Sequence, residues 1–565
     1  MDSIFFISTF FGGIGILFFG LKIINDGLQA VFGDFIRKIM SKMSKKPVGA
    51  LSAGLILTAI IQSSSITTVM SVGLVNAGVM ELAQAIGIIF GANVGTTITA
   101  WFFTFFSEVN AWLLIGLGFI PALFTKSSYF EQWGKSLIGF GLVFLGLFAL
   151  KIFFTTPLIQ DSLVDWLFFF NQDNYLSFFI LSIVAIFLTM LIQSSTAMVG
   201  IIMVLFVSSY FSMAATASLI FGANIGTTIN ALIASNEGNT SAKRAARVHT
   251  LFNLLGAIIL FCFFEPFLAL VVKGTPFFKL PEGYSFYQAL PRELNLDGVY
   301  LVATIHTFFN LISALLFFPM IKLFEKMIIK MTPANSLERE IPHLLMLGNP
   351  QDLIPATSII QAESEVIKLS DIVARMFALT KEYWNDENFE LKKLSKILDY
   401  ERITDNIHKE LTIFLCYVME KPLSHHQSEQ TQALIKIADE LESVADYLER
   451  LAHYRERFKA GENLEGDSRT EFFDFMNQVH QFYESVMNSL IKKQTMDLSH
   501  IREKSEELQI WADSIRDKHL ERIARGEYRP VTALTFSDMV VALRKIRTHS
   551  MHLANGVQVL NTDLN

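Results

Sequence analysis

One stretch of this sequence, residues 174–236, contains no Asp, Glu, Lys or Arg. A run of about 20 apolar residues is long enough to cross a bilayer as a helix, so this stretch predicts membrane-spanning helices. Further candidate spans carry very few charges: 4–24, 47–80, 82–107, 111–124, 137–154, 248–272 and 298–321. A purely soluble fold is therefore disfavoured.

Charged residues are distributed unevenly along the chain. Residues 1–330 hold 18 basic and 15 acidic side chains, whereas residues 331–565 hold 28 and 38. This change in charge density predicts a membrane domain followed by a soluble, acidic one. Neither part supplies the basic face that a phosphate backbone needs, so we expect no nucleic-acid partner. The two cysteines, Cys262 and Cys416, form neither a disulfide framework nor a metal motif.

Two polar motifs lie inside the apolar runs, and each occurs twice. Gln62-Ser63-Ser64-Ser65 returns as Gln193-Ser194-Ser195-Thr196, and Gly91-Ala92-Asn93-Val94-Gly95-Thr96-Thr97 returns as Gly222-Ala223-Asn224-Ile225-Gly226-Thr227-Thr228. Both pairs are offset by 131 positions. Two separate motifs at one offset indicate a true internal repeat.

Basic residues in short loops predict the orientation, because such loops stay in the cytoplasm. Segments 37–46, 243–247 and 322–330 are basic, whereas 155–176 has no Lys or Arg. The N-terminus is then external and the soluble part cytoplasmic. We further assume that each Gln-Ser-Ser motif is the tip of a re-entrant hairpin and that each Gly-Ala-Asn motif interrupts a full crossing.

The two repeats then have opposite orientations, and inverted repeats with broken helices at the midplane are typical of secondary transporters. The predicted fold is therefore all-α. It consists of a polytopic membrane domain of two inverted repeats with re-entrant hairpins and broken helices, followed by a soluble helical bundle.

The repeated motifs carry hydroxyls and amides but no Asp, Glu or His. Hydroxyls at a half-helix start suit a small oxyanion such as phosphate, which predicts phosphate ligands at Gln62, Ser63, Ser64, Ser65, Gln193, Ser194, Ser195 and Thr196. Carbonyl, amide and hydroxyl oxygens suit sodium, which predicts ligands at Asn93, Thr96, Thr97, Asn224, Thr227 and Thr228. A proton-coupled carrier normally needs a titratable group in the span, so sodium coupling is favoured.

Two other interpretations of these motifs remain open at this point. Small-residue clusters are common where membrane helices pack. A nucleophilic serine would need a base and an acid, but the closest histidines are His249 and His306 and no acid partner is evident, so we expect no enzyme. These histidines start a second small duplication, 249–253 and 306–310, for which we favour interhelical hydrogen bonding.

At these motifs the sequence resembles the type II sodium/phosphate cotransporter family in its bacterial branch, as it also does at residues 17–29 and 244–253. One departure is Thr196, which keeps a hydroxyl. The resemblance covers about residues 1–325 and implies that phosphate lies between the hairpin tips, with sodium in the same region. It implies an inner (plasma) membrane protein that takes up phosphate with sodium. Alternatives are a phosphate exporter of the same fold and a membrane-anchored phosphate sensor.

This resemblance gives the predicted domain boundaries. A transport domain spans 1–325, with repeats at about 4–124 and 133–272 and an extra span at 298–324. A linker at 326–350, which contains three prolines, precedes a cytoplasmic domain at 351–565.

The soluble part has apolar stripes at helical spacing over 359–369, 397–417, 432–454, 470–491 and 498–523, with a last helix over 535–560. It resembles the PhoU family, whose Glu-x-x-x-Asp motifs gather metal ions. The resemblance implies a divalent metal held by Glu401, Asp405, Glu442 and Asp446. A second copy of the motif has Arg544 and Thr548 at the carboxylate positions. The alternative is a solvated acidic helix face. A homodimer or a regulatory protein could bind through this domain.

Overall fold

The computed structural model describes residues 2–41, 46–105, 108–157, 159, 174–236, 238–276, 284–289, 295–333, 353, 355–385, 391–458 and 464–561. Helices dominate these residues, and no strand occurs among them, so the all-α prediction is confirmed. The chain forms two compact units. The membrane unit is built mainly from Met1–Glu338, and the C-terminal bundle mainly from Ser358–Lys421 and His425–Asn565.

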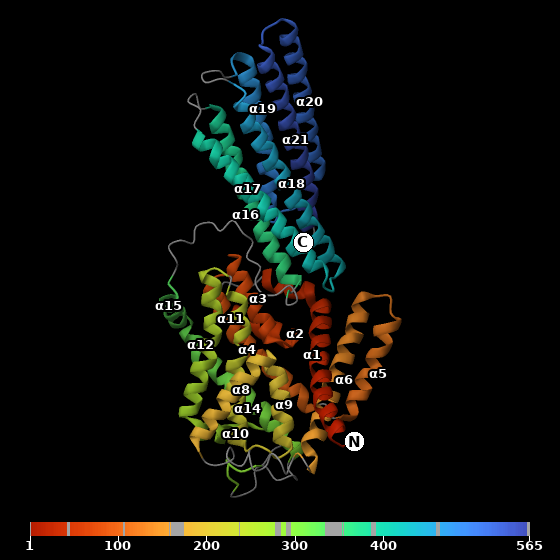
Figure 1. Cartoon of the computed structure of the whole chain (residues 1–565), viewed down its shortest axis with the longest axis vertical. Helices are drawn as coiled ribbons and strands as arrows, with labels where there is room; N and C mark the ends of the chain where they lie inside the picture. Colours follow the sequence, from red (N-terminus) through yellow and green to blue (C-terminus); the bar gives the residue numbers. More distant parts are fainter. Residues whose placement is uncertain are drawn as a thin grey trace. The chain divides into compact units, whose positions relative to one another are not determined.

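The helices of the membrane unit differ widely in length, from the 7 residues of α11 to the 40 residues of α1 (Figure 1). They are α1 (Asp2–Ser41), α2 (Pro47–Ile61), α3 (Ser64–Asn76), α4 (Leu82–Phe105), α5 (Glu108–Phe124), α6 (Ser128–Thr155), α8 (Tyr175–Ile192), α9 (Ser195–Val207), α10 (Met213–Gly226), α11 (Ile229–Ser235), α12 (Thr240–Cys262), α13 (Phe264–Gly274), α14 (Asn295–Phe317) and α15 (Ile321–Met331). A short 3-10 turn, Phe318–Met320, joins α14 to α15.

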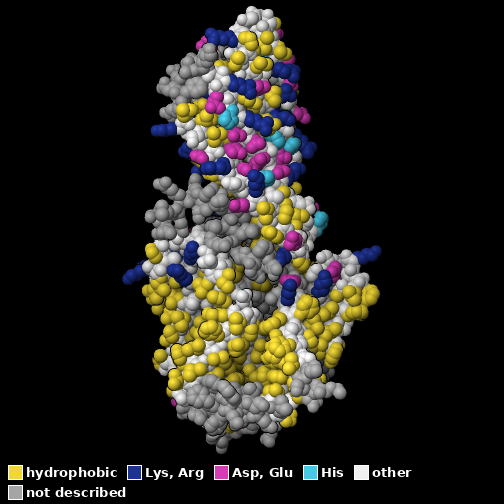
Figure 2. Space-filling view, in the orientation of Figure 1, with side chains coloured by type: hydrophobic (Ala, Val, Ile, Leu, Met, Phe, Trp, Pro, Cys, Tyr) yellow, Lys and Arg dark blue, Asp and Glu magenta, His cyan; other side chains and the backbone are white. Residues whose placement is uncertain are grey.

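Among the described residues of this unit, seven segments are long and apolar enough to cross a membrane: Phe5–Gly33, Leu82–Thr104, Ser128–Thr155, Tyr175–Ile192, Met213–Ser235, Thr240–Cys262 and Gly298–Met331. Their outer surface is apolar, as Figure 2 shows on one face, and Phe187 and Leu191 of α8 are 67% and 77% exposed. A soluble protein rarely exposes so continuous an apolar surface. The chain is therefore a multi-pass membrane protein.

At each Gln-Ser-Ser motif, two helices are joined by a tight turn. In the first repeat α2 reverses into α3 at Gln62 and Ser63, and in the second α8 reverses into α9 at Gln193 and Ser194. At 13 to 15 residues, α2, α3 and α9 are shorter than the roughly 20 residues that a full crossing needs, whereas α8, with 18 residues, is the longest of the four. That the hairpins are re-entrant, and that the repeats are inverted, stays a prediction.

The Gly-Ala-Asn motifs differ between the copies. In the second copy α10 ends at Gly226 and α11 begins at Ile229, as the predicted interruption requires. In the first copy the prediction is wrong, because α4 runs unbroken from Leu82 to Phe105.

The motif glycines serve close helix packing in both copies. A Cβ on Gly95 would lie 2.6 Å from the carbonyl oxygen of Leu55 in α2, and a Cβ on Gly226 would lie 2.6 Å from that of Ile186 in α8. A Cβ on Gly91 would collide with the carbonyl oxygen of Leu51. The packing interpretation therefore accounts for these glycines, while the Asn and Thr side chains of the motifs need a separate explanation.

The described part of the C-terminal bundle contains six helices, as the apolar stripes predict: α16 (Pro355–Asn385), α17 (Leu391–Met419), α18 (His425–Arg455), α19 (Gly466–Ile491), α20 (Leu498–Ala524) and α21 (Pro530–Asn561). Charged side chains cover much of its surface in Figure 2. Its interior is apolar and includes the fully buried Trp384 and Phe377 of α16.

Part of the predicted linker is helical. Residues 326–331 are the last turns of α15, and the following Thr332 accepts two hydrogen bonds from Arg244 at its carbonyl oxygen, at 2.9 and 2.8 Å. Residues 334–350 of the linker and residues 160–173 of the predicted external segment lie outside the described residues. The domain boundaries stay a prediction.

Replacing Gly91 by alanine should destabilise the membrane unit, because its Cβ would meet backbone and no flexible side chain can make room. Overpacking of this kind costs about 1–3 kcal/mol. Gly116→Ala in α5 is the matched control, since nothing lies within 4 Å of its added Cβ. Thermal unfolding of the detergent-solubilised protein should show a lower midpoint for Gly91→Ala only. Equal midpoints for the two variants would contradict the close contact of α2 and α4.

Candidate functional site

The two hairpin turns have the same local conformation. Gln62 (φ 62°) and Gln193 (φ 58°) both lie in the left-handed region, which few residues other than glycine adopt. The next residue caps the following helix: the Oγ of Ser63 accepts from the Ile66 N–H at 3.3 Å, and that of Ser194 from the Ala197 N–H at 3.2 Å. Each turn thus reverses the chain within two residues and starts a new helix with its first N–H groups unbonded.

Both turns line one cavity of about 80 Å³ in the membrane unit. Its lining comprises all eight predicted phosphate ligands and two residues of α1: Gln62, Ser63, Ser64, Ser65, Gln193, Ser194, Ser195, Thr196, Leu21 and Asn25. The structure therefore brings together residues that are 131 positions apart in the sequence. The volume exceeds the roughly 30 Å³ share of a water molecule, so the cavity has room for a small oxyanion.

The electrostatics of the cavity come from dipoles, because no charged side chain is among its lining residues. The N-termini of α3 and α9 carry the positive ends of two helix dipoles and their free N–H groups. Ser64 and Ser195, at these N-termini, are 5% and 4% exposed. The Oδ1 of Asn25 is buried without a partner among the described residues. This arrangement suits an anion that is held by hydroxyl and N–H donors.

Residues of the second repeat contact Ser65 of the first repeat. The Oγ of Ser65 lies 3.2 Å from the Oγ1 of Thr227, a predicted sodium ligand, and accepts from the Nδ2 of Asn230 at 3.0 Å. The same Nδ2 donates to the Gln193 carbonyl oxygen at 2.9 Å. One amide therefore ties the two hairpin tips to α11. The Oε1 of Gln62 accepts from Thr99 at 2.8 Å.

The six predicted sodium ligands are all buried: Asn93, Thr96, Thr97, Asn224, Thr227 and Thr228. Several donate to carbonyl oxygens of their own helix, such as Thr96 to Ala92 at 3.0 Å and Thr97 to Val94 at 2.8 Å. A hydroxyl that donates its proton this way keeps lone pairs for a cation. Only Thr227 of the six is linked by a hydrogen bond to a tip residue in the described structure.

A histidine contacts one of these residues. The Nε2 of His306 in α14 lies 3.3 Å from the Oδ1 of Asn224 in α10, which is the interhelical hydrogen bond that we expected. Neither ring nitrogen of His249 has a partner among the described residues. The two copies also share an aromatic contact. The ring centroids of Phe90 and Phe252 are 4.5 Å apart, and those of Phe221 and Phe309 are 4.9 Å apart. The two copies of the second duplication thus lie on α12 and α14, and each of these helices packs next to one Gly-Ala-Asn motif.

In the C-terminal bundle the four predicted metal ligands lie between α17 and α18, divided over two clusters. These are Glu401 with Asp446 and Glu449, and Asp405 with His408 and Glu442. Within each cluster the candidate ligand atoms lie within 4.8 Å of one another. Carboxylates with one imidazole fit a divalent cation.

The carboxylates of these clusters repel one another. Burial raises the pKa of Glu401, and the nearby Glu449 and Asp446 raise it further. Burial also raises the pKa of Glu442, again with a contribution from Asp446. A bound cation would relieve this repulsion.

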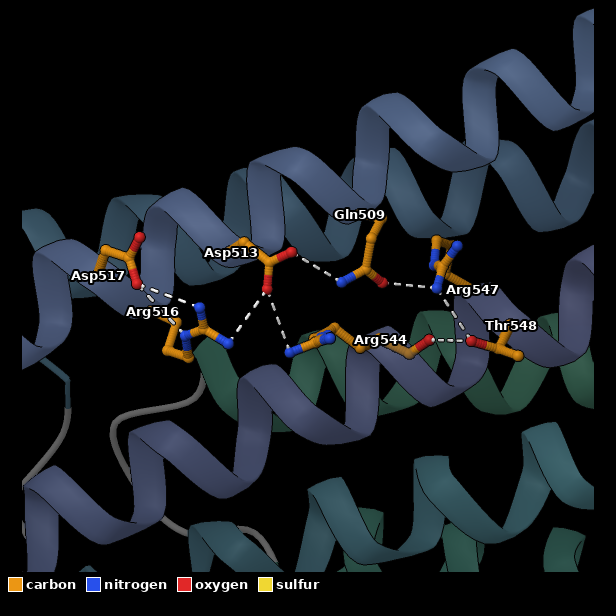
Figure 3. A network of polar contacts seen from close by, with 7 residues as sticks. All are labelled: Gln509, Asp513, Arg516, Asp517, Arg544, Arg547 and Thr548. Carbon is orange, nitrogen blue, oxygen red and sulfur yellow. Dashed lines mark hydrogen bonds and ion pairs between the residues drawn. The ribbon is translucent and has the colours of Figure 1, made fainter.

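The second half of the bundle has guanidinium groups at the corresponding place (Figure 3). Arg544 of α21 and Arg516 of α20 both pair with the Oδ1 of Asp513, at 3.4 and 3.3 Å. Arg547 donates to the Oγ1 of Thr548 at 3.1 Å. Where the second copy of the motif has Arg544 and Thr548 in place of carboxylates, the structure therefore has a local ion-pair network.

Comparisons with known proteins assign both parts of the chain. A family model described as Na+/Pi-cotransporter matches residues 16–151 and 156–273, and a PhoU domain model matches residues 366–454. YqeW of Bacillus subtilis, an uncharacterized protein, is 30% identical over 325 residues, which cover 57% of this chain and 97% of that protein. This chain belongs to the Na+/Pi-cotransporter family. Its C-terminal bundle contains a PhoU domain.

Other relatives of this Na+/Pi-cotransporter family member carry functional names. YjbB of Salmonella typhimurium, provisionally named an inorganic phosphate export protein, is 28% identical over 433 residues, or 76% of this chain and 74% of that protein. The mouse sodium-dependent phosphate transport protein 2A is 38% identical over 81 residues, or 14% of this chain and 13% of that protein. No solved structure matches the chain significantly. The family consists of transporters, so this protein is not an enzyme.

Several residues of these sites were missed in the sequence. Asn25, which lines the cavity, and Asn230, which donates to both tips, lie outside the duplicated motifs, so only the fold brings them to this site. His408 and Glu449 carried a weak signal, because each is three residues beyond a predicted ligand and therefore on the same helix face.

Removing one carboxylate should stabilise the folded state of the ion-free PhoU bundle at neutral pH. A carboxyl whose folded pKa exceeds its unfolded value stabilises the fold at low pH and loses that contribution as pH rises through the folded pKa. At pH 7 in EDTA, Glu401→Gln should therefore slow hydrogen–deuterium exchange in α17 and α18, and the difference should shrink toward pH 4. Glu503→Gln, at an exposed carboxylate of α20, is the control. Faster exchange in Glu401→Gln would contradict the repulsion.

Proposed function

We propose that this protein is a secondary active transporter that couples sodium to the movement of inorganic phosphate across the inner membrane, in the direction of uptake. The observation that carries the proposal is the cavity at which two hydroxyl-rich helix starts, one from each repeat, meet without any charged side chain. Membership of the Na+/Pi-cotransporter family supports phosphate as the substrate.

In this proposal phosphate sits between Ser63, Ser64 and Ser65 of one tip and Ser194, Ser195 and Thr196 of the other, with the amides of Gln62 and Gln193 at the edge. The N–H groups at the starts of α3 and α9 and the hydroxyls donate to its oxygens. Because the donors are neutral, the anion keeps much of its charge uncompensated. A nearby cation therefore strengthens its binding.

Sodium supplies that cation. Its proposed ligands are oxygens of Asn93, Thr96, Thr97, Asn224, Thr227 and Thr228, and the 3.2 Å contact of Thr227 with Ser65 supports a site close to the anion. An empty carrier and a carrier with both ions are then the favoured forms, since either ion alone leaves a charge in a low-dielectric site. This is the physical basis of symport.

We further propose the arrangement around this site. A transport domain at 1–325 contains inverted repeats and has its N-terminus outside, and a PhoU-like domain at 351–565 lies in the cytoplasm. The PhoU-like domain regulates transport, through divalent metal at Glu401, Asp405, Glu442 and Asp446 and through a homodimer or a regulatory protein.

Two other functions have a specific observation in their favour. Export is supported by the name of the YjbB relatives, and a coupled carrier can run in either direction along its gradients. Proton coupling is supported by the contact of His306 with Asn224, because it places a titratable side chain next to a proposed sodium ligand. A membrane-anchored phosphate sensor would retain the cavity but would not transport.

Proteoliposomes that contain the purified protein separate sodium coupling from proton coupling, and transport from sensing. We expect uptake of labelled phosphate under an inward sodium gradient and none under an inward proton gradient in sodium-free buffer. His306→Gln should keep sodium-driven uptake, since glutamine can bond to Asn224 but cannot titrate. Proton-driven uptake that His306→Gln abolishes would establish the proton-coupled alternative, and absence of any gradient-driven flux would favour the sensor.

Removing one hydroxyl from either tip should weaken phosphate transport. Ser64→Ala and Ser195→Ala each remove a donor to a charged ligand, worth about 1.5–3 kcal/mol, which is roughly tenfold or more in apparent phosphate affinity. Ser71→Ala is the matched control in α3, because its hydroxyl donates to the Thr67 carbonyl at 2.9 Å and does not line the cavity. Wild-type phosphate affinity in both tip variants would remove them from the binding site.

A further inference from the structure

A third cluster of ligand-type side chains lies between α18 and α21, apart from the two acidic clusters of α17 and α18. It consists of Glu440, His549 and His552, whose candidate ligand atoms lie within 4.8 Å of one another. The Nδ1 of His549 is 2.7 Å from Glu440 Oε2, and the Nδ1 of His552 is 3.1 Å from Glu440 Oε1. The two histidines are three residues apart, so they project from the same face of α21.

The burial of this cluster suits a bound ion. The carboxylate of Glu440 is 15% exposed and His549 is 22% exposed, whereas His552 is 48% exposed. The inner ligands are thus held by the bundle, and the outer one leaves a path from solvent. The ring of His549 is further fixed by Tyr447, whose ring lies 5.7 Å away.

The charge balance points the same way. Glu440 forms no ion pair with a Lys or Arg among the described residues, and its two partners are imidazoles. A half-buried carboxylate without a fixed cation gains from a bound one. In the second half of the bundle, by contrast, Asp513 already has Arg516 and Arg544.

We propose that Glu440, His549 and His552 bind a divalent transition-metal ion of the zinc class and thereby link α18 to α21. Two imidazoles and one carboxylate form a recognised zinc ligand set, which leaves a fourth position for water. Ligands about 2.0–2.2 Å from zinc at tetrahedral angles lie about 3.3–3.6 Å from each other. The observed separations are slightly shorter, so a small outward rotation of the imidazoles admits the ion.

Metal binding requires both Nδ1 atoms to be unprotonated, with the ring proton on Nε2. Zinc thus replaces the two hydrogen bonds that join the histidines to Glu440. Because α18 closes the first three helices of the bundle and α21 closes the second three, the ion joins the two halves of the PhoU-like domain.

Zinc binding to the full-length protein in detergent tests this site. The acidic clusters are first disabled by Glu401→Gln and Glu442→Gln, one change in each, so that they do not dominate the titration. Calorimetry and elemental analysis should then find about one zinc per chain, as one three-ligand site predicts. Cobalt should give the visible absorption of a tetrahedral site with nitrogen ligands.

In this background His549→Ala and Glu440→Gln should each abolish the cobalt spectrum. Each should also weaken zinc binding by more than about 100-fold, since changes outside the ligand shell alone cost about 10–100-fold. His500→Ala is the matched control, because this histidine is exposed and lies 3.9 Å from a single glutamate. Hydrogen–deuterium exchange in metal-free buffer confirms that the variants keep the fold.

An unchanged zinc content in folded His549→Ala and Glu440→Gln would overturn the proposal. So would a parent protein that binds no zinc once the acidic clusters are disabled. In either case Glu440 would only accept hydrogen bonds from the two histidines.

Discussion

The unbonded N–H groups at the starts of α3 and α9 are the constraint on which the membrane unit depends. Inside a bilayer such groups cannot be left facing lipid, so both helix starts must face protein or a polar cavity. The left-handed turns at Gln62 and Gln193 place them in the same cavity. Asn230 then holds the second tip to Ser65, and Thr99 holds the side chain of Gln62. These bonds tie the two tips to α4 and α11.

Close helix packing next to the tips gives the two repeats the same local structure. Glycines of α4 and α10 let α2 and α8 approach until backbone touches backbone, at the same relative positions in the two copies. A 131-residue offset in the sequence thus becomes a structural equivalence. The His306 contact and the Phe pairs extend this equivalence to α12 and α14.

The sequence was sufficient for the helical class, the two helix–turn–helix segments and eight of the ten residues that line the cavity, because glycines, hydroxyls and repeats are local signals. It was insufficient where the answer depends on neighbours. The Gly91 motif has the composition of a helix break, but α4 stays whole because the space next to its glycines is filled by α2. Asn25, Asn230 and the contact of His306 with Asn224 depend on how separate helices meet. The motifs themselves contain no titratable residue, but the fold places His306 next to Asn224. The composition of the motifs is therefore a weak argument against proton coupling.

The arginines at the second PhoU site have a consequence for how this domain responds to its surroundings. Arg516 and Arg544 are counter-charges built into the chain, which dilution and chelators cannot remove. Between α17 and α18, Lys409 pairs with Asp405 at 2.7 Å and Arg450 with Asp446 at 4.0 Å, whereas Glu401 and Glu442 have no Lys or Arg partner among the described residues. In the metal-bound domain that we propose, loss of the ion therefore leaves Glu401 and Glu442 next to acidic neighbours that raise their pKa values. Ion removal from the proposed sites would thus act on the half of the bundle that contains α17 and α18 and not on the network at Asp513.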